Sequence, residues 1–250
     1  MTTELIKELF DCGAHYGYSR SRRHPSATPY LYGFKNRTAI IDLERTIQTL
    51  TSAENFFREL GRSGRQCLLV GTKPEARAAV ELISQKLGFP YVSGRWIGGT
   101  LTNFSEIKKR LARLAELKKQ FSTAGLEVYT KQERARFQKE LTRLETAFSS
   151  IATLTGLPAA VFVVDAKAEK IAVAEARTLG LPVVSISGTD CDLGEIDYPV
   201  VANDNSAKTI EWILRRLATA HDLGRQEQQE QEREKALAET AVTDDQHQTN

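Results

Sequence analysis

Short apolar runs alternate along this chain with longer segments in which apolar residues recur every three or four positions. The short runs have the length and composition of strands and lie at 39–42, 66–70, 91–92, 160–164, 182–186 and 198–201. The longer segments have the spacing of amphipathic helices and lie at 43–60, 75–87, 168–179 and 206–223, after a short helix over 1–14. Because strands alternate with helices, the pattern predicts an α/β fold with a mostly parallel, doubly wound sheet of the Rossmann or flavodoxin type.

A second pattern interrupts this alternation between the third and fourth strands. Apolar residues there approach the heptad spacing of a coiled coil, first at Ile107, Leu111, Leu114 and Phe121, and then at Phe137, Leu141, Leu144, Phe148 and Ile151. Two such helices joined near Gly125 predict an antiparallel coiled-coil hairpin inserted in the sheet domain. About 20 residues on each side give an arm about 30 Å long at 1.5 Å per residue.

The patterns divide the chain into four parts. Residues 1–104 hold the N-terminal helix, a loop over 15–36 that is basic, aromatic and irregular, and the first half of the α/β domain. Residues 105–154 form the predicted hairpin, and residues 155–223 the second half of the α/β domain. Residues 224–250 are an acidic Gln/Glu-rich tail that lacks core-forming residues, and we expect this tail to be disordered or at most transiently helical.

Charge is distributed unevenly along the chain. The formal net charge is +2, but residues 222–250 contain eight acids and three bases, so the remaining body carries a net charge of +7. Residues 15–37 contain five Lys or Arg and no acid. A local block of this kind neutralises phosphates even where the overall charge is modest.

The residues that would identify an enzyme or a metal protein are missing from the sequence pattern. The three cysteines form no CxxC pair, which predicts no metal site and suits a reducing, cytoplasmic compartment. The Gly71-Thr72-Lys73 turn lacks the spacing of a phosphate loop, and no GxGxxG follows a strand. Asp42 and Asp165 both follow strands, where N-capping is a better interpretation than a catalytic carboxylate pair. No apolar run reaches the roughly 20 residues that span a bilayer. We therefore expect no catalytic residues, cofactor, small-molecule substrate or membrane association.

Two segments have the chemistry of RNA binding. In the segment 15–37, five aromatic residues interleave with five Lys or Arg, and such a mixture stacks on bases and binds phosphates. The run Arg95-Trp96-Ile97-Gly98-Gly99-Thr100-Leu101-Thr102-Asn103-Phe104 combines a charge, a flat ring, a flexible Gly-Gly pair and short hydrogen-bonding groups. The alternative for this run is a structural loop in which Trp96 fills a gap in the core.

Several motifs, in this order along the chain, resemble one known family. They are Ala14-His15-Tyr16-Gly17, Pro29 to Asn36, Ile40 to Thr46, Val70 to Lys73, Arg95 to Phe104, and Leu157-Pro158 with Val161 to Asp165. Together they resemble small-subunit ribosomal protein two of the bacterial type, from about Leu5 to His221. The resemblance implies a Rossmann-like sheet with a protruding coiled coil, binding to small-subunit rRNA on the ribosome in the cytoplasm, and no catalysis. It also implies ribosomal proteins one, three, five and eight as neighbours. The chain departs from the family's pattern at Tyr18, at Arg23 to Ala27, at Gly188 to Leu193 and at Ala202 to Asn205.

These observations predict a structural constituent of the small ribosomal subunit that binds rRNA and neighbouring proteins in translation. We expect the rRNA contacts at Arg20, Arg22, Arg23, His24, Lys35, Asn36, Arg37, Lys73, Arg95, Trp96, Thr102 and Asn103. Further contacts with RNA or protein are expected on the hairpin at Lys108, Lys109 and Arg113. Two alternatives remain open from the sequence. One is an α/β enzyme that binds a nucleotide or sugar phosphate, and the other is a coiled-coil adaptor without RNA.

Overall fold

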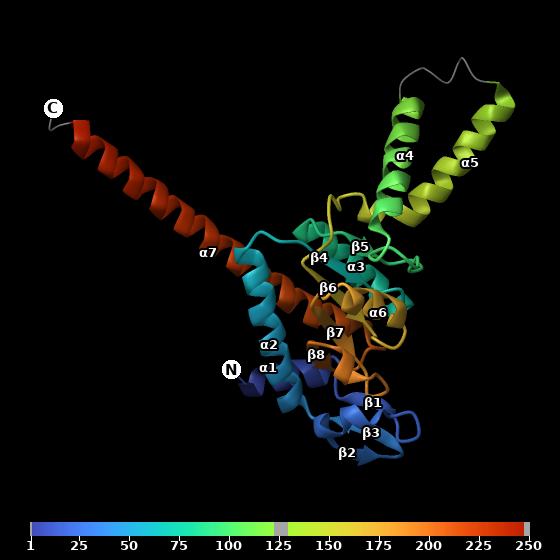
Figure 1. The fold of residues 1–250 in the computed structure, drawn as a ribbon. Helices are drawn as coiled ribbons and strands as arrows, with labels where there is room; N and C mark the ends of the chain where they lie inside the picture. The colour runs from blue at the N-terminus through green and yellow to red at the C-terminus, as the bar shows by residue number, and fades with distance from the viewer. Residues whose placement is uncertain (1, 123–129, 248–250) are drawn as a thin grey trace.

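A five-stranded parallel sheet lies at the centre of the computed structural model, which describes residues 2–122 and 130–247 (Figure 1). The strands are β4 (Cys67–Val70), β5 (Tyr91–Val92), β6 (Ala160–Val164), β7 (Val183–Ser187) and β8 (Tyr198–Val201). Their spatial order is β5-β4-β6-β7-β8. In chain order this reads 2-1-3-4-5, the order of flavodoxin-like doubly wound folds. The predicted parallel sheet is therefore confirmed, and its strand order reverses between β4 and β6.

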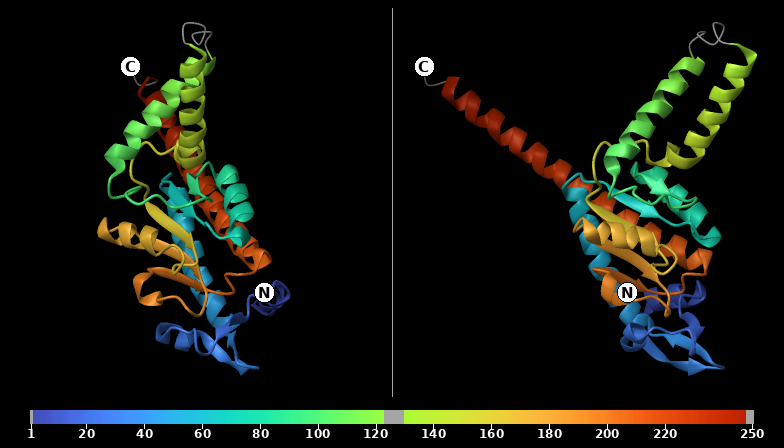
Figure 2. Two further views of the ribbon diagram at one scale, coloured as in Figure 1. Left: turned by 90° about the vertical axis from the view of Figure 1, so that its right-hand side faces the viewer. Right: turned by 45° about the vertical axis from the view of Figure 1, so that its right-hand side comes forward.

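Helices cover both faces of this sheet (Figure 2). On one face lie α2 (Leu43–Arg62), α3 (Pro74–Leu87) and α7 (Ala207–His247), and on the other lie α6 (Lys170–Thr178) and the bases of α4 and α5. Phe162 of β6 packs into the first layer, whereas its neighbour Val163 packs into the second. All five residues of β6 are buried, as expected of a parallel strand covered on both sides. None of the helices in the described part of the chain combines the length and apolarity needed to cross a membrane.

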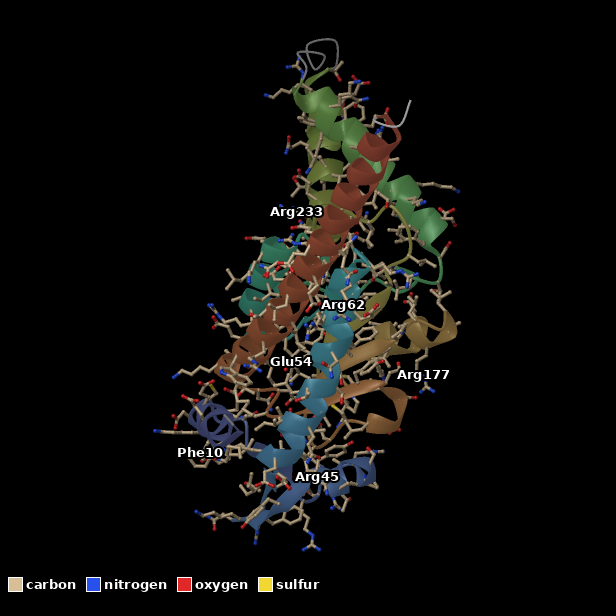
Figure 3. All side chains as sticks on the ribbon, turned by 90° about the vertical axis from the view of Figure 1, so that its left-hand side faces the viewer. Phe10, Arg45, Glu54, Arg62, Arg177 and Arg233 are labelled. Carbon is tan, nitrogen blue, oxygen red and sulfur yellow. The ribbon has the colours of Figure 1, made fainter. Side chains whose placement is uncertain are left out.

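The closing helix α7 crosses α2 at two glycines. Figure 3 shows α2, which carries Glu54 and Arg62, lying along α7. A Cβ on Gly224 would overlap the carbonyl oxygen of Arg58, and one on Gly61 would overlap that of His221. Glycine at both positions lets the two backbones approach closely because it has no Cβ.

The predicted end of the closing helix was wrong. The sequence placed it at Leu223 because Gly224 commonly ends a helix, but α7 continues to His247. Gly224 serves the close packing against α2 instead. Beyond the crossing, Arg58 and Arg62 both bind the Glu227 carboxylate and hold the first turn after Gly224 against α2. The tail that was predicted to be disordered is thus helical through His247.

The segment expected to be an irregular loop forms part of a small antiparallel sheet. After α1 (Thr2–Asp11), β1 (Tyr16–Ser19), β2 (Leu31–Lys35) and β3 (Thr38–Ile41) pair in the order β1-β3-β2, with the 3-10 helix η1 (Pro25–Tyr30) before β2. The prediction that 39–42 belongs to the main sheet was therefore wrong. Only Ala39 and Ile41 are buried in β3, and such alternation is typical of an antiparallel strand with one covered face.

The long insertion between β5 and β6 contains both of its predicted helices. They are α4 (Phe104–Ser122) and α5 (Lys131–Phe148), which project side by side away from the sheet (Figures 1 and 2). Arg113 Nε donates to Glu140 Oε1 across the pair at 3.0 Å, and Lys118 lies 3.3 Å from Glu145. The turn predicted near Gly125 lies outside the described residues. The 3-10 helices η3 (Ser149–Ile151) and η4 (Leu193–Glu195) complete the fold.

Candidate nucleic-acid interface

Arginine and aromatic side chains gather on the small antiparallel sheet. The guanidinium carbons of Arg20 and Arg23 lie 5.6 and 6.0 Å from the ring centre of Phe34, and that of Arg22 lies 4.8 Å from the ring centre of Tyr18. Stacking of this kind orients a guanidinium group and leaves its N–H edge free to bind a phosphate bidentately. The sheet therefore presents cations in fixed orientations.

The hairpin turn between β2 and β3 adds two more cations. Asn36 and Arg37 have φ angles of 48° and 66°, the left-handed pair that a tight hairpin turn requires. Left-handed backbone costs a residue with a Cβ about 1–2 kcal/mol, so the flanking strand pair holds this turn in place. Lys35 and Arg37 are both exposed. With Arg20, Arg22 and Arg23 they form the N-terminal cationic surface, and within the described residues none of these five cations has an ion-pair partner.

His24 has internal contacts and lies at the base of this surface. Its Nδ1 is 2.8 Å from Ser26 Oγ and caps η1, and its backbone N–H donates to the carbonyl oxygen of Thr189 at 2.9 Å. The hydroxyl of Thr189 accepts from the backbone N–H of Tyr18 at 2.9 Å. The loop after β7 thus fastens the small sheet to the main sheet.

A single carboxylate organises the second predicted RNA-binding segment. Glu175 of α6 accepts hydrogen bonds from Trp96 Nε1 and the Gly99 N–H at Oε1, at 3.0 and 2.8 Å. Its Oε2 accepts from the Leu101 N–H and from both the N–H and the hydroxyl of Thr102, at 3.0 to 3.2 Å. The loop is therefore folded around one buried acid.

The hydrogen bonds to Glu175 also set its ionisation. Burial by itself raises the pKa of this carboxyl, but hydrogen bonds from Trp96 and from three backbone N–H groups outweigh burial, and the net pKa lies below its usual value. Trp96 is buried in the second core layer, so it organises the loop and does not offer an exposed ring. Arg95 and Asn103 remain exposed at the two ends of the loop.

Lys73 lies in the crevice at the carboxyl ends of β4 and β6, where a ligand binds in many folds of this type. Its Nζ is 2.6 Å from Asp165 Oδ2, 3.3 Å from Asp204 Oδ2 and 2.9 Å from Asn205 Oδ1. The side chain of Asn205 donates to the Tyr18 hydroxyl at 2.7 Å. Lys73 thus neutralises two carboxylates beneath the small sheet and is not presented for a phosphate.

The rest of the crevice is also filled by the chain itself. Glu169 Oε1 accepts from the N–H of Thr72 at 2.9 Å and from its hydroxyl at 2.6 Å. Asp165, Cys191 and Asp204 bring one possible metal-ligand atom each within 4.8 Å of one another, and the ammonium group of Lys73 supplies positive charge to two of them. Burial, followed by repulsion from Asp165, raises the pKa of Asp204 to about 6.

The three cations that were predicted to make contacts from the hairpin differ in whether they already have acidic partners. Lys109 pairs with Glu106 at 2.6 Å, and Arg113 binds Glu116 and Glu140. Lys108 is exposed and lies 5.3 Å from the ring centre of Phe104. These cations therefore form a solvated helix surface in which two of the three already have acidic partners.

Sequence reasoning missed the residues that hold the predicted segments in place. Glu175 lies in an ordinary helical stretch, and nothing in the residues around it indicates that it binds Gly99, which is 76 positions away in the sequence. Asp204 and Glu169 likewise act across long separations, on Lys73 and Thr72. A weak signal was available for Glu175, because an acid on the inward face of an amphipathic helix needs buried donors.

Two comparisons with known proteins give the same family. The family model described as "Ribosomal protein S2" matches residues 9–224. A protein of Geotalea uraniireducens (strain Rf4) named small ribosomal subunit protein uS2 is 39% identical over 220 residues, which cover 88% of this chain and 86% of that protein.

Proposed function

Because this chain belongs to the ribosomal protein S2 family and is thus a structural constituent of the small ribosomal subunit, we propose that its N-terminal cationic surface grips folded rRNA. The observation that carries the proposal is the set of five cations on the small sheet without acidic partners in the described chain. Cations left unpaired in a compact protein are available to release counterions from RNA, which is the main source of affinity for a polyanion.

The aromatic residues of the small sheet add a second type of contact. Tyr32 is 83% exposed and Phe34 is 43% exposed next to stacked arginines. Exposed rings beside guanidinium groups bind unpaired bases by stacking, at about 1–3 kcal/mol per base. Asn36 at the tip of the hairpin turn adds a hydrogen-bonding amide. Arg95 and Asn103, at the ends of the loop held by Glu175, extend the proposed contact toward α4.

The remaining finer points also stand as proposals. The proposed coiled-coil character of α4 and α5 is supported by their shared buried residues and by two ion pairs between them. Ribosomal proteins one, three, five and eight remain the proposed neighbours, on the resemblance alone. We also propose that the chain works in the cytoplasm, bound to ribosomes. We propose further that the four-part division of the chain, into two halves of the α/β domain, the hairpin and the tail, corresponds to parts with separate functions.

A structural role without catalysis is favoured over a nucleotide-binding enzyme. Members of this family are generally not enzymes, and the comparison supports the ribosomal assignment directly. The filled crevice agrees with it, because Lys73 is paired with Asp165 and Glu169 accepts hydrogen bonds from Thr72 at the point where a nucleotide phosphate would bind. The adaptor alternative has no comparable support.

Salt dependence of binding tests the proposal. The full chain, fluorescently labelled, is titrated onto small subunits from which it has been stripped, over a range of salt concentrations. About six phosphate contacts predict a log–log slope of roughly −4 to −5, and R22Q/R37Q should reduce its magnitude by about 2. The matched control K7Q/K208Q removes two exposed cations from α1 and α7 that have no ion-pair partner among the described residues, and it should leave the slope unchanged. A flat titration, or equal slopes for both variants, would refute the proposal.

A further inference from the structure

His221 lies at the point where the closing helix α7 crosses α2. It is 6% exposed, and its backbone carbonyl oxygen is the group that a Cβ on Gly61 of α2 would overlap. Its ring packs edge-to-face on Phe89, which follows α3, and the two ring centres are 4.9 Å apart. One imidazole is therefore enclosed where α2, α3 and α7 meet, just before Gly224.

The imidazole of His221 has no acceptor for a second proton. Its Nδ1 is buried and has no hydrogen-bond partner among the described residues. A neutral imidazole tolerates this position because Nδ1 can stay unprotonated, whereas an imidazolium ion carries a proton on both nitrogens. Protonation would leave a charge and a donor unsatisfied in the core, and both are costly.

The charges around His221 do not offset this cost. The charged side chains at the crossing are the cations Arg58, Arg62, Lys86 and Arg225 and the acids Glu59, Asp222 and Glu227. Asp222, the acid next to His221 in the chain, is already 2.9 Å from Lys86 and 3.9 Å from Arg225. Burial lowers the pKa of His221, Asp222 opposes this in part, Arg225 reinforces it, and the net pKa lies below its usual value of 6.5.

The part of α7 beyond this crossing depends on it for attachment. Figure 1 shows the helix projecting clear of the sheet after it passes α2. Among the described residues, Glu227 is the one charged residue beyond Gly224 with a printed ion pair to another element, which it makes with Arg58 and Arg62. The close approach of the two backbones at Gly61 and Gly224 thus holds the base of a long lever.

We propose that His221 is an acid-sensitive latch, in which protonation of the imidazole opens the α2–α7 crossing and frees the acidic segment beyond Gly224. At neutral pH the ring is uncharged, packs on Phe89 and keeps the crossing closed. In acid the ring gains a charge that the core does not accommodate, so it moves to solvent and separates α7 from α2. Opening also releases Arg58 and Arg62 from Glu227. This inference is independent of the proposed rRNA surface.

The latch works over a defined range of pH. Because the pKa of His221 is lower in the closed form than its usual value of 6.5, the crossing is fully stable above pH 6.5. It loses stability as the pH falls from 6.5 to the closed-state pKa. Over this range the equilibrium constant for opening rises about tenfold per pH unit.

His15 provides a matched comparison for His221. It is 8% exposed, its Nδ1 also has no partner among the described residues, and burial also lowers its pKa. Its ring, however, contacts Phe10 and Tyr16 beside the small sheet and not the helix crossing. Removing His15 therefore tests whether any buried histidine would produce the same effect.

Hydrogen exchange of the full chain tests the latch. Protection factors, which correct for the pH dependence of intrinsic exchange, are measured at pH 7.5 and pH 5.5. In wild type we expect residues 226–247 to lose about tenfold in protection relative to β6 at the lower pH. H221F and H221Q do not titrate at this position and should retain their protection, and H15F should behave like wild type.

Two results of this experiment would overturn the proposal. An equal loss of protection in wild type and in both His221 variants would mean that other groups open the crossing. Unchanged protection in wild type would mean that protonation does not open it. Titration of the His221 ring by NMR in the wild-type chain requires no variant to fold. We expect a midpoint below pH 6.5, and a midpoint at or above the usual value would also overturn the latch.

Discussion

Replacing Glu175 with glutamine perturbs the loop of residues 95–104 at the buried carboxylate around which it folds. The carboxylate accepts five hydrogen bonds, three of them at Oε2 from Leu101 and Thr102. An amide retains one acceptor oxygen and places an NH₂ group against the donors on the other side. Because an unsatisfied buried donor costs about 1–3 kcal/mol, leaving the two N–H groups of Leu101 and Thr102 without an acceptor predicts a loss of about 3 kcal/mol in the free energy of unfolding.

The pH dependence gives this prediction a second test. The pKa of Glu175 is lower in the folded chain than its usual value of 4.5, so its contribution is fully present above pH 4.5 and is lost as pH falls through the folded pKa. The advantage of wild type over E175Q should therefore be constant near neutral pH and shrink in acid. Urea unfolding followed by fluorescence of Trp96, in a W212F background, measures both quantities. T102V, which removes one exposed hydroxyl contact, should cost less than about 1 kcal/mol.

The reasoning would be refuted by a small or pH-independent effect of E175Q. A loss below about 1 kcal/mol would mean that the loop finds other acceptors, since that is the typical net worth of one ordinary hydrogen bond. A difference that persists unchanged into acid would mean that the charge of the carboxylate is not what holds the loop.

Three further predictions concern the crevice, the helix crossing and the small sheet. K73M should lower the free energy of unfolding by about 3–5 kcal/mol at pH 7, because it leaves two buried carboxylates unpaired. The loss should be smaller at pH 5, because the pKa of Asp204 is raised to about 6 and protonation removes its repulsion with Asp165. Equal losses in urea unfolding at both pH values would contradict this. G224A should lower the free energy of unfolding by about 3 kcal/mol, because its Cβ overpacks against α2. G98A should be nearly neutral in thermal melts, because its Cβ would meet nothing within 4 Å. Y32S should leave stability within about 0.5 kcal/mol of wild type but weaken subunit binding, and an unchanged affinity in the titration would exclude stacking by Tyr32.

The main sheet was predictable because its signals are local. Each of its five strands is a short apolar run, and Pro74 and Asp42 mark helix starts by their own backbone chemistry, with Asp42 Oδ1 accepting from the Glu44 N–H at 3.0 Å. The small sheet was missed because its strands β1 and β2 contain Gly, Ser and Tyr in place of an aliphatic run. Their pairing depends on β3, whose partner residues lie about 20 positions away from β1 in the sequence.

The charged residues of the candidate site could be predicted from the sequence, but the residues that hold them in position could not. Clustering of Arg20, Arg22 and Arg23 follows from their proximity in sequence. The function of Lys73 does not, because its partners Asp165 and Asp204 lie in distant parts of the chain and meet only where the sheet order reverses. The end of α7 was mispredicted for the same reason, since Gly224 acts through a helix that is distant in sequence.

The central claim is that the chain is a platform whose cationic surface grips rRNA while its own Lys73 fills the sheet crevice. A cryo-electron microscopy map of the small subunit carrying this chain tests both halves at once. The account predicts rRNA phosphates against Arg20, Arg22 and Arg37, with Lys73 still paired to Asp165 and Asp204. A small sheet that faces solvent or protein without RNA, or a nucleotide bound in place of Lys73, would contradict it.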